Sequence, residues 1–335
     1  MIEAHQLCKQ YGDFQAVRDI SLTVRPGEVV ALLGPNGAGK TTTVRMLGAI
    51  LKPTRGTARV AGYDVVTDAR IVRSRVGLLT EYPGLYSRMR ALEYLHFFGN
   101  LLGLDATQSQ RRAELLLRQF GLWDARTKRL DSYSKGMRQK IALVRALIHD
   151  PPVLFLDEPT TAMDPQSART VRDAIGELRN AERSILLTTH NLTEAEELAD
   201  RIAIVHSGQV VAQGTIQELM LHLMGAPVWE LRLATRGTAF DVLLGDLVTI
   251  EEQGADYVRY RCPEPHHSNP QIIARLAECG LPLMSIAEMP RSLEQVYLRI
   301  VEAQGQHDLR YTPQQSGNGR IEEPTRNTTL PEVSS

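Results

Sequence analysis

The sequence predicts an α/β protein with a parallel-sheet core, a helical insertion and a small α+β C-terminal domain. Three features carry this prediction: short apolar runs followed by helical patterns, a helical stretch in the middle of the chain, and alternating strand patterns near its end. The chain has 335 residues, which is enough for two domains and a sizeable core.

The apolar runs lie at 28–33, 153–157 and 184–189. Continuous apolar runs of this length are typical of central strands in a parallel sheet that is covered on both faces. Each run is followed by turn residues and then by a helical pattern, as expected of strand–helix–strand units. From about 88 to 150 helical patterns dominate, and we expect an insertion there.

The last third of the chain has a different texture. After 225 the pattern alternates as half-buried strands do, and two helical patterns follow at 269–280 and 291–304. We therefore expect a first domain over 1–225 and a small α+β domain over 226–304. Polar and small residues dominate 305–335, which predicts a disordered tail.

Composition and charge exclude several classes of protein. The net charge is −1, so a general basic field for nucleic acid is absent, and no nucleic-acid partner is expected. No apolar run approaches the ~20 residues that a membrane span needs, and the N-terminus lacks the shape of a secretory signal. The three cysteines are far apart and odd in number, which fits a reducing cytoplasm rather than a disulfide framework.

The stretch GPNGAGKT, Gly34 to Thr41, carries the spacing G-x-x-x-x-G-K-T between an apolar run and a helical pattern. Glycines let the backbone turn tightly, so that N–H groups point into one concavity beside the positive end of a helix. Lys40 is expected to reach the β- and γ-phosphates of a nucleotide, and the Thr41 hydroxyl to bind Mg²⁺. A glycine-rich turn without a ligand is the alternative.

An acidic pair, Asp157 and Glu158, ends the apolar run at 153–157. Ligands of open α/β sheets bind outside the carboxyl ends of the strands, so Asp157 is expected to face the Mg²⁺ held by Thr41. Glu158 is then a candidate general base or water-orienting group for attack on the γ-phosphate. A solvated acidic pair is the alternative. A kinase would need a second substrate site, of which the sequence gives no sign, so hydrolysis is the simpler interpretation.

The stretch YSKGMRQK, Tyr133 to Lys140, precedes a helical pattern at 137–149 that is apolar almost all round. Ser134 is a good N-cap, so Ser134 and Gly136 are expected at a second anchored helix N-terminus. One nucleotide does not obviously need two such anion-binding devices. The pattern makes sense if this helix end addresses the γ-phosphate of a nucleotide held by another copy.

These motifs together resemble those of the ATP-binding subunits of ABC transporters. GPNGAGKT resembles the Walker A loop, VLFLDEP the Walker B strand and YSKGMRQK the family signature, in family order over about 1–215. The resemblance implies a P-loop NTPase cassette that hydrolyses ATP with Mg²⁺. It also implies a second cassette, most simply a second copy, whose site the signature completes, and a separate membrane permease.

The resemblance assigns roles to further residues. Tyr11 matches the aromatic that stacks on adenine, Asp164 the D-loop position and His190 the switch histidine that contacts the γ-phosphate; each could instead be only structural. The implied nucleotide contacts are Tyr11, Gly34, Asn36, Gly37, Gly39, Lys40, Thr41, Thr42, Glu81, Ser134, Gly136, Asp157 and Asp164. Those implied as Mg²⁺ ligands are Thr41, Asp157 and Glu81, and those implied as catalytic are Glu158 and His190.

Two motifs depart from the family pattern. Lys135 and Met137 stand where the signature more often has Gly and Gln, and Glu81 occupies the Q-loop position that usually holds glutamine. Ser134 and Gly136 are kept, so the phosphate-facing helix end survives. A carboxylate at position 81 can still bind Mg²⁺ or hold water, although it adds negative charge near the phosphates.

The resemblance also implies a place in the cell. The segment from Glu81 to Leu95 would line a groove for a permease helix, or merely pack the insertion. The ending SLEQVYLRIVEA resembles export cassettes, so we expect a cytoplasmic subunit that powers export from the inner face of the plasma membrane. A soluble ABC ATPase acting on a ribosome or DNA is the alternative, and a cassette that binds nucleotide without hydrolysis is a weaker one.

Overall fold

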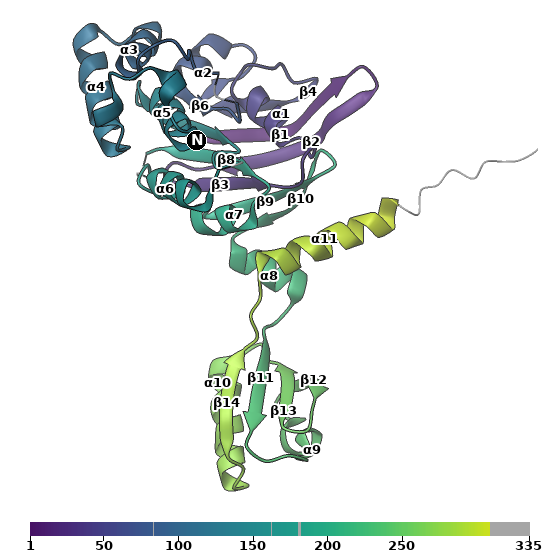
Figure 1. Cartoon of the computed structure of the whole chain (residues 1–335). Coiled ribbons are helices and arrows are strands. Elements are labelled where there is room, and N and C mark those ends of the chain that lie inside the picture. The colour runs from purple at the N-terminus through teal and green to yellow at the C-terminus, as the bar shows by residue number, and fades with distance from the viewer. Residues whose placement is uncertain (83, 162, 180–181, 309–335) are drawn as a thin grey trace, which may run out of the picture.

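The computed structural model describes residues 1–82, 84–161, 163–179 and 182–308. These residues form a large α/β body and a smaller four-stranded domain that extends from one side of it (Figure 1). Among them no helix is both long and apolar enough to cross a bilayer.

A ten-stranded sheet organises the large body, in the order β5-β4-β1-β2-β10-β9-β3-β8-β7-β6. The strands β9, β3, β8, β7 and β6 pair in parallel, whereas β1, β2, β4 and β5 pair antiparallel with one another. The strands are β1 Ile2–Tyr11, β2 Phe14–Val24, β3 Val29–Leu33, β4 Arg55–Val60, β5 Tyr63–Asp64, β6 Val76–Leu79, β7 Val153–Asp157, β8 Ser184–Thr189, β9 Arg201–His206 and β10 Gln209–Gly214.

The parallel strands are covered on both faces, as their apolar runs predict. All residues of β3, β7 and β8 are buried, and alternate residues of β3 belong to two different hydrophobic cores. One core takes residues from α1 and α2, and the other takes residues from α5 to α8. These helices are α1 Lys40–Leu47, α2 Ala69–Arg75, α5 Lys135–Leu147, α6 Pro165–Gly176, α7 Leu192–Leu198 and α8 Ile216–Met224.

Helices fill the chain between β6 and β7, where the helical insertion is expected. They are α3 Ala91–Leu101, α4 Ala106–Gln119, the short helices η1 Trp123–Ala125 and η2 Leu130–Ser132, and α5. Asp105 caps α4 by accepting a hydrogen bond from the Gln108 backbone N–H at 2.8 Å. Figure 1 shows α3 and α4 together at one end of the sheet.

The small domain has its own antiparallel sheet, in the order β12-β13-β11-β14, and its own core. Leu231, Val258 and Tyr260 on the strands pack with Phe240 and Ile272 on the two helices. Its elements are β11 Val228–Leu233, α9 Phe240–Leu244, β12 Thr249–Gln253, β13 Tyr257–Arg261, α10 Pro265–Glu278 and β14 Leu283–Glu288.

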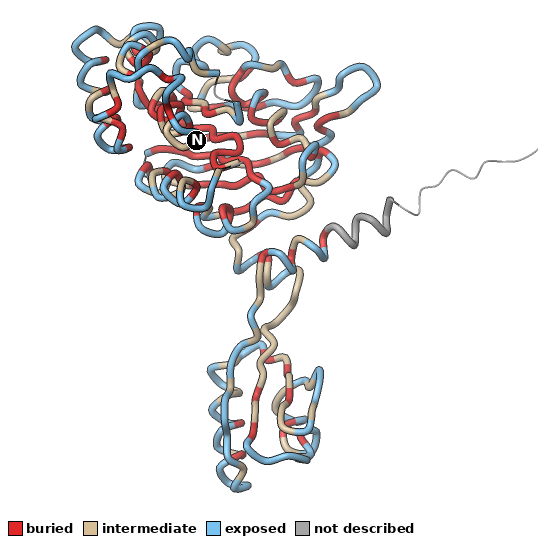
Figure 2. The backbone as a smooth tube through the Cα atoms, in the orientation of Figure 1, coloured by how far each residue is buried: buried red, intermediate tan, exposed pale blue. Residues whose placement is uncertain are grey.

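The last helix, α11 Leu293–Asp308, packs against the large body rather than the small domain. The spacing of Leu293, Val296 and Ile300 places them on one face of the helix. All three belong to the hydrophobic core of the large body. Figure 2 shows buried positions along the part of α11 whose burial is described, up to residue 300. The helix also continues to Asp308, past the point where the expected tail begins, and 309–335 lie outside the described residues.

Candidate active site

The loop from Gly34 to Thr41 joins β3 to α1, and Lys40 is the first residue of α1. A Cβ atom at Gly34 would lie 2.1 Å from the Val205 carbonyl oxygen, so no larger residue fits there. Gly39 has φ +100, a conformation that side chains disfavour, and caps α1. The sequence thus folds the loop tightly and presents the first N–H groups of α1 at its centre.

Lys40 is buried within this loop, where its side chain is 6% exposed. Its Nζ donates to the carbonyl oxygens of Gly34 at 2.7 Å and Pro35 at 3.2 Å, and it lies 3.3 Å from Glu158 Oε1. The ammonium is therefore held at the loop from which it can meet a phosphate, with an acidic partner just after the end of β7.

Asp157 ends β7 next to the start of α1, as the sequence predicts. The Thr41 hydroxyl donates to Asp157 Oδ1 at 3.0 Å, and the Thr188 hydroxyl of β8 donates to the same oxygen at 2.6 Å. Two hydroxyls thus fix one carboxylate oxygen beside the phosphate loop. The proximity of Thr41 and Asp157, 116 positions apart in the chain, follows from the order β3-β8-β7 in the sheet.

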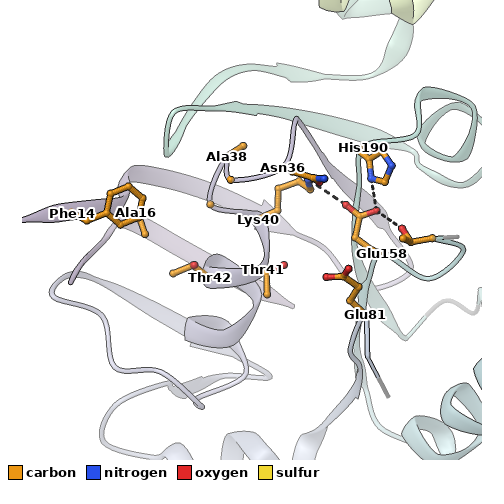
Figure 3. A pocket seen from close by; sticks show the side chains of 13 residues that line it. Phe14, Ala16, Asn36, Ala38, Lys40, Thr41, Thr42, Glu81, Glu158 and His190 are labelled. Atoms are coloured by element: carbon orange, nitrogen blue, oxygen red, sulfur yellow. Dashed lines mark hydrogen bonds and ion pairs between the residues drawn. The ribbon is translucent and has the colours of Figure 1, made fainter. Parts of the chain in front are cut away.

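Glu158 lies in a strained backbone conformation, with φ 51 in the left-handed region. This turns its side chain toward the loop, where each carboxylate oxygen has its own partners (Figure 3). Oε1 faces Lys40, whereas Oε2 accepts from the Thr161 hydroxyl at 2.9 Å and lies 2.8 Å from His190 Nδ1. Strain of this kind is typical of functional positions, and here it orients an acid between a lysine and a histidine.

Lys40, Thr41, Glu158 and His190 line one cavity of about 360 Å³, whereas Asp157 is not among its lining residues (Figure 3). Glu81, from the loop after β6, also lines it, so the Q-loop position does face the phosphate loop. The lining residues are Phe14, Ala16, Asn36, Gly37, Ala38, Gly39, Lys40, Thr41, Thr42, Glu81, Glu158, Thr161 and His190.

The aromatic that lines this cavity is Phe14 rather than Tyr11. Tyr11 ends β1, is 47% exposed, and pairs with Phe14 across the hairpin turn. The Lys9 Nζ lies 5.2 Å from the centre of the Tyr11 ring. Phe14 was not predicted as a site residue. Two aromatic residues that flank a two-residue turn could have indicated it, because cross-strand partners project from the same face of the sheet.

The signature and D-loop residues lie elsewhere. Ser134 caps α5 by accepting from the Met137 N–H at 3.2 Å, and Asp164 caps α6 by accepting from the Ser167 N–H at 2.9 Å. Hydrogen bonds from the side chain and the backbone N–H of Ser167 lower the pKa of Asp164. Ser134, Gly136 and Asp164 are all within the described part of the chain, and none of them lines the cavity at the phosphate loop.

Gly136 lies beside the start of α6, since a Cβ atom there would be 3.0 Å from Ser167 Oγ. The signature and D-loop therefore form one local surface of the chain, apart from its own phosphate loop.

Comparison with known proteins agrees with this geometry. The family model of the ABC transporter matches residues 17–161. The daunorubicin/doxorubicin resistance ATP-binding protein DrrA of Streptomyces peucetius is 38% identical over 304 residues, which are 89% of this chain and 92% of that protein. The Nod factor export ATP-binding protein I of Paraburkholderia xenovorans is 38% identical over 230 residues, 69% of this chain and 76% of that protein.

A solved structure of an ATP-binding subunit of an ABC transporter superposes with a TM-score of 0.62 and 30% identity, covering 73% of this chain and 98% of that one. The cassette fold is thus shared with such a subunit, and the range matched by the family model includes both the phosphate loop and the acidic strand end. The chain belongs to the ATP-binding proteins of ABC transporters, which bind and hydrolyse ATP and work with a membrane permease.

Proposed function

We propose that two copies of this chain sandwich two Mg-ATP molecules and drive export through a separate permease, from the cytoplasmic face of the membrane. The observation that carries the proposal is that the predicted site residues lie on two separate parts of the chain. Lys40, Glu158 and His190 meet at the phosphate loop, whereas Ser134 and Gly136 lie apart from it on the same chain.

Glu158 is the general base in this proposal. Its Oε2 is fixed by Thr161 and His190, so the carboxylate is oriented before substrate binds. A water beside the γ-phosphate would give its proton to Glu158 as it attacks, and Lys40 would stabilise the negative charge on the phosphate oxygens. His190, whose other ring nitrogen remains to contact the γ-phosphate, would report the presence of that phosphate to α7.

The residues at the strand end fit Mg²⁺. Thr41 and Asp157 place a hydroxyl and a carboxylate oxygen 3.0 Å apart, and Glu81 lines the cavity at the phosphate loop together with Thr41. No group of three or more His, Cys, Asp or Glu is arranged for a metal within the ranges that the structure covers. Mg²⁺ commonly uses one or two carboxylates, waters and the phosphates of its nucleotide, and bound there it would neutralise phosphate charge.

Asp157→Asn is expected to remove the Mg²⁺-dependent part of ATP affinity and leave the Mg²⁺-free part unchanged. The amide oxygen can still accept from Thr41 and Thr188, so the fold is kept while the charge is lost. Titration with a fluorescent ATP analogue, with Mg²⁺ and with EDTA, measures both parts. An equal loss of affinity in EDTA would contradict the assignment of Asp157 to the metal.

The surface beside the Q-loop supports docking of a permease helix. A second cavity of about 370 Å³ lies between the loop after β6 and the insertion. Tyr82 on its rim is 82% exposed, and Tyr86 nearby is 51% exposed. Large exposed aromatics of this kind mark protein interfaces. The residues that line this cavity are Tyr82, Gly84, Leu85, Ser87, Leu130, Asp131 and Arg138.

Tyr82→Asp is expected to lower the yield of co-purified permease at least about tenfold, because a charge replaces a hot-spot aromatic worth about 2 kcal/mol. ATP binding should be unchanged, since the exposed side chain packs little of the fold. The matched control is Leu101→Asp, which changes an exposed apolar residue of α3, 69% exposed, outside this cavity.

The measurement is affinity purification of tagged protein from gently solubilised membranes of its own host, followed by mass spectrometry. A polytopic membrane protein in stoichiometric yield, lost in Tyr82→Asp but not in Leu101→Asp, supports the proposal. Ribosomal or DNA-repair proteins without a membrane partner would favour the soluble-ATPase alternative. The names of the relatives refer to daunorubicin/doxorubicin resistance and to Nod factor export, and the permease found here would decide the class of substrate.

A further inference from the structure

Glu194 is a buried acid that the proposed reaction does not use. It lies on α7 and is 1% exposed. A buried carboxyl costs free energy unless hydrogen bonds compensate for the water that it loses, so the partners of Glu194 indicate its role.

Its partners come from two different loops. The Thr160 hydroxyl, on the loop after β7, donates to Glu194 Oε1 at 2.7 Å. A side-chain hydrogen bond from Thr189, the last residue of β8, lowers the pKa of the same carboxyl. Both threonines are buried, so water cannot replace these bonds readily. One side chain on α7 therefore ties together the loops that leave two neighbouring strands.

The next residue in each loop holds the proposed base. Thr161 follows Thr160, and His190 follows Thr189; these two are the residues that hold Glu158 Oε2, at 2.9 Å and 2.8 Å. A peptide bond joins each threonine to its neighbour, so a shift of the threonine also shifts the partner of Glu158. A misplacement of about 1 Å can cost on the order of 10²-fold in rate.

We propose that Glu194 is a positioning residue for ATP hydrolysis, which holds Thr160 and Thr189 so that Thr161 and His190 keep Glu158 in its reactive orientation. The inference rests on the proposed role of Glu158 as the base. Burial raises the pKa of Glu194, and the nearby Glu158 raises it further, which favours the neutral carboxyl.

The test compares Glu194→Ala with Glu194→Gln in the full-length protein. Glu194→Ala is expected to lower kcat for ATP about 10-fold or more, because the loops that carry Thr161 and His190 lose a hydrogen-bond partner. KM should stay within about twofold of wild type, because the phosphate loop is unchanged. Glu194→Gln keeps the size of the side chain and an oxygen that can accept from Thr160, so it should restore kcat to within about threefold of wild type. The matched control is Glu197→Gln on the same helix, whose side chain is 50% exposed, and it should leave kcat unchanged.

Thr160→Val tests the same bond from its other end and serves if Glu194→Ala does not fold. It should lower kcat, and the double variant Thr160→Val/Glu194→Ala should lose no more than Glu194→Ala alone, because both changes break one hydrogen bond. Wild-type kcat in both Glu194→Ala and Thr160→Val would overturn the inference. So would a loss confined to KM, or equal losses in Glu194→Ala and Glu194→Gln. If Glu158→Gln itself kept its turnover, the role of the base would fail instead.

Discussion

Glu158→Gln is expected to lower the ATP turnover number by about 10²- to 10³-fold while ATP affinity stays within about threefold. A positioned base contributes on the order of 10²- to 10⁴-fold, and glutamine cannot accept the proton of the attacking water. The amide keeps the size of the side chain, and its oxygen can still accept the Thr161 hydroxyl. The loss should therefore fall on the chemical step rather than on nucleotide binding.

The trapped state gives this prediction a second readout. Without hydrolysis, ATP continues to stabilise the closed arrangement, so Glu158→Gln should form a dimer in Mg-ATP and return to monomer when the nucleotide is removed. Size-exclusion chromatography with light scattering measures this, beside phosphate release. Glu114→Gln, an exposed acid of α4, is the control and should retain turnover and show no trapped dimer.

Either of two results would contradict the assignment. Near-normal phosphate release from Glu158→Gln would show that another group takes the proton. A loss of turnover accompanied by a large loss of ATP affinity would make the Lys40–Glu158 ion pair, at 3.3 Å, the main role of the carboxylate.

The parts of the fold that could be predicted are those whose causes are local in the sequence. β3, β7 and β8 have apolar runs because each is buried along its whole length between two layers of helices. The phosphate loop could be predicted because its glycines are required locally. Gly34 lies too close to the Val205 carbonyl for a side chain, and Gly39 has a positive φ. Asp157 could be placed beside Thr41 because strand ends meet at one edge of a parallel sheet.

The parts that could not be predicted depend on long-range packing. The apolar face of α11 is visible in the sequence, but the pattern does not say that it packs on the large body rather than on the domain just before it. Phe14 lines the cavity because of how the two strands of the hairpin pair, which the sequence alone does not show. The family pattern predicted Tyr11 instead. Glu194 looks like one more acid of a polar helix, and only the tertiary fold buries it beside Thr160.

The other large effect is expected at the signature. Gly136→Asp should lower the ATP turnover number about 100-fold or more. The affinity of the single chain for ATP should be unchanged. The reason is geometric: Lys40 lines the nucleotide cavity of its own chain and Gly136 does not. Lys40→Ala should instead lose ATP binding itself. A fluorescent ATP analogue measures binding under conditions where the protein is monomeric, and phosphate release measures turnover.

Folding must be controlled, because a Cβ atom at position 136 would approach Ser167 Oγ to 3.0 Å. Gly176→Asp, at the end of α6, is the matched control, since nothing lies within 4 Å of a Cβ there. Both variants should retain a cooperative thermal transition, and Gly176→Asp should retain turnover. Equal loss of ATP affinity in Gly136→Asp and Lys40→Ala would place the signature in the site of its own chain.

Mixing the two inactive variants tests the arrangement directly. A dimer of one Lys40→Ala chain and one Gly136→Asp chain contains one composite site with an intact phosphate loop and an intact signature. If half of the dimers are mixed and the sites act independently, activity should return to about a quarter of wild type, by the exchange expected of a symmetric interface. Recovery at any level that follows the fraction of mixed dimers requires that the signature of one chain completes the site of the other. If mixed dimers form, each with one ATP bound, and still hydrolyse nothing, the result contradicts a composite site that turns over independently of the other site.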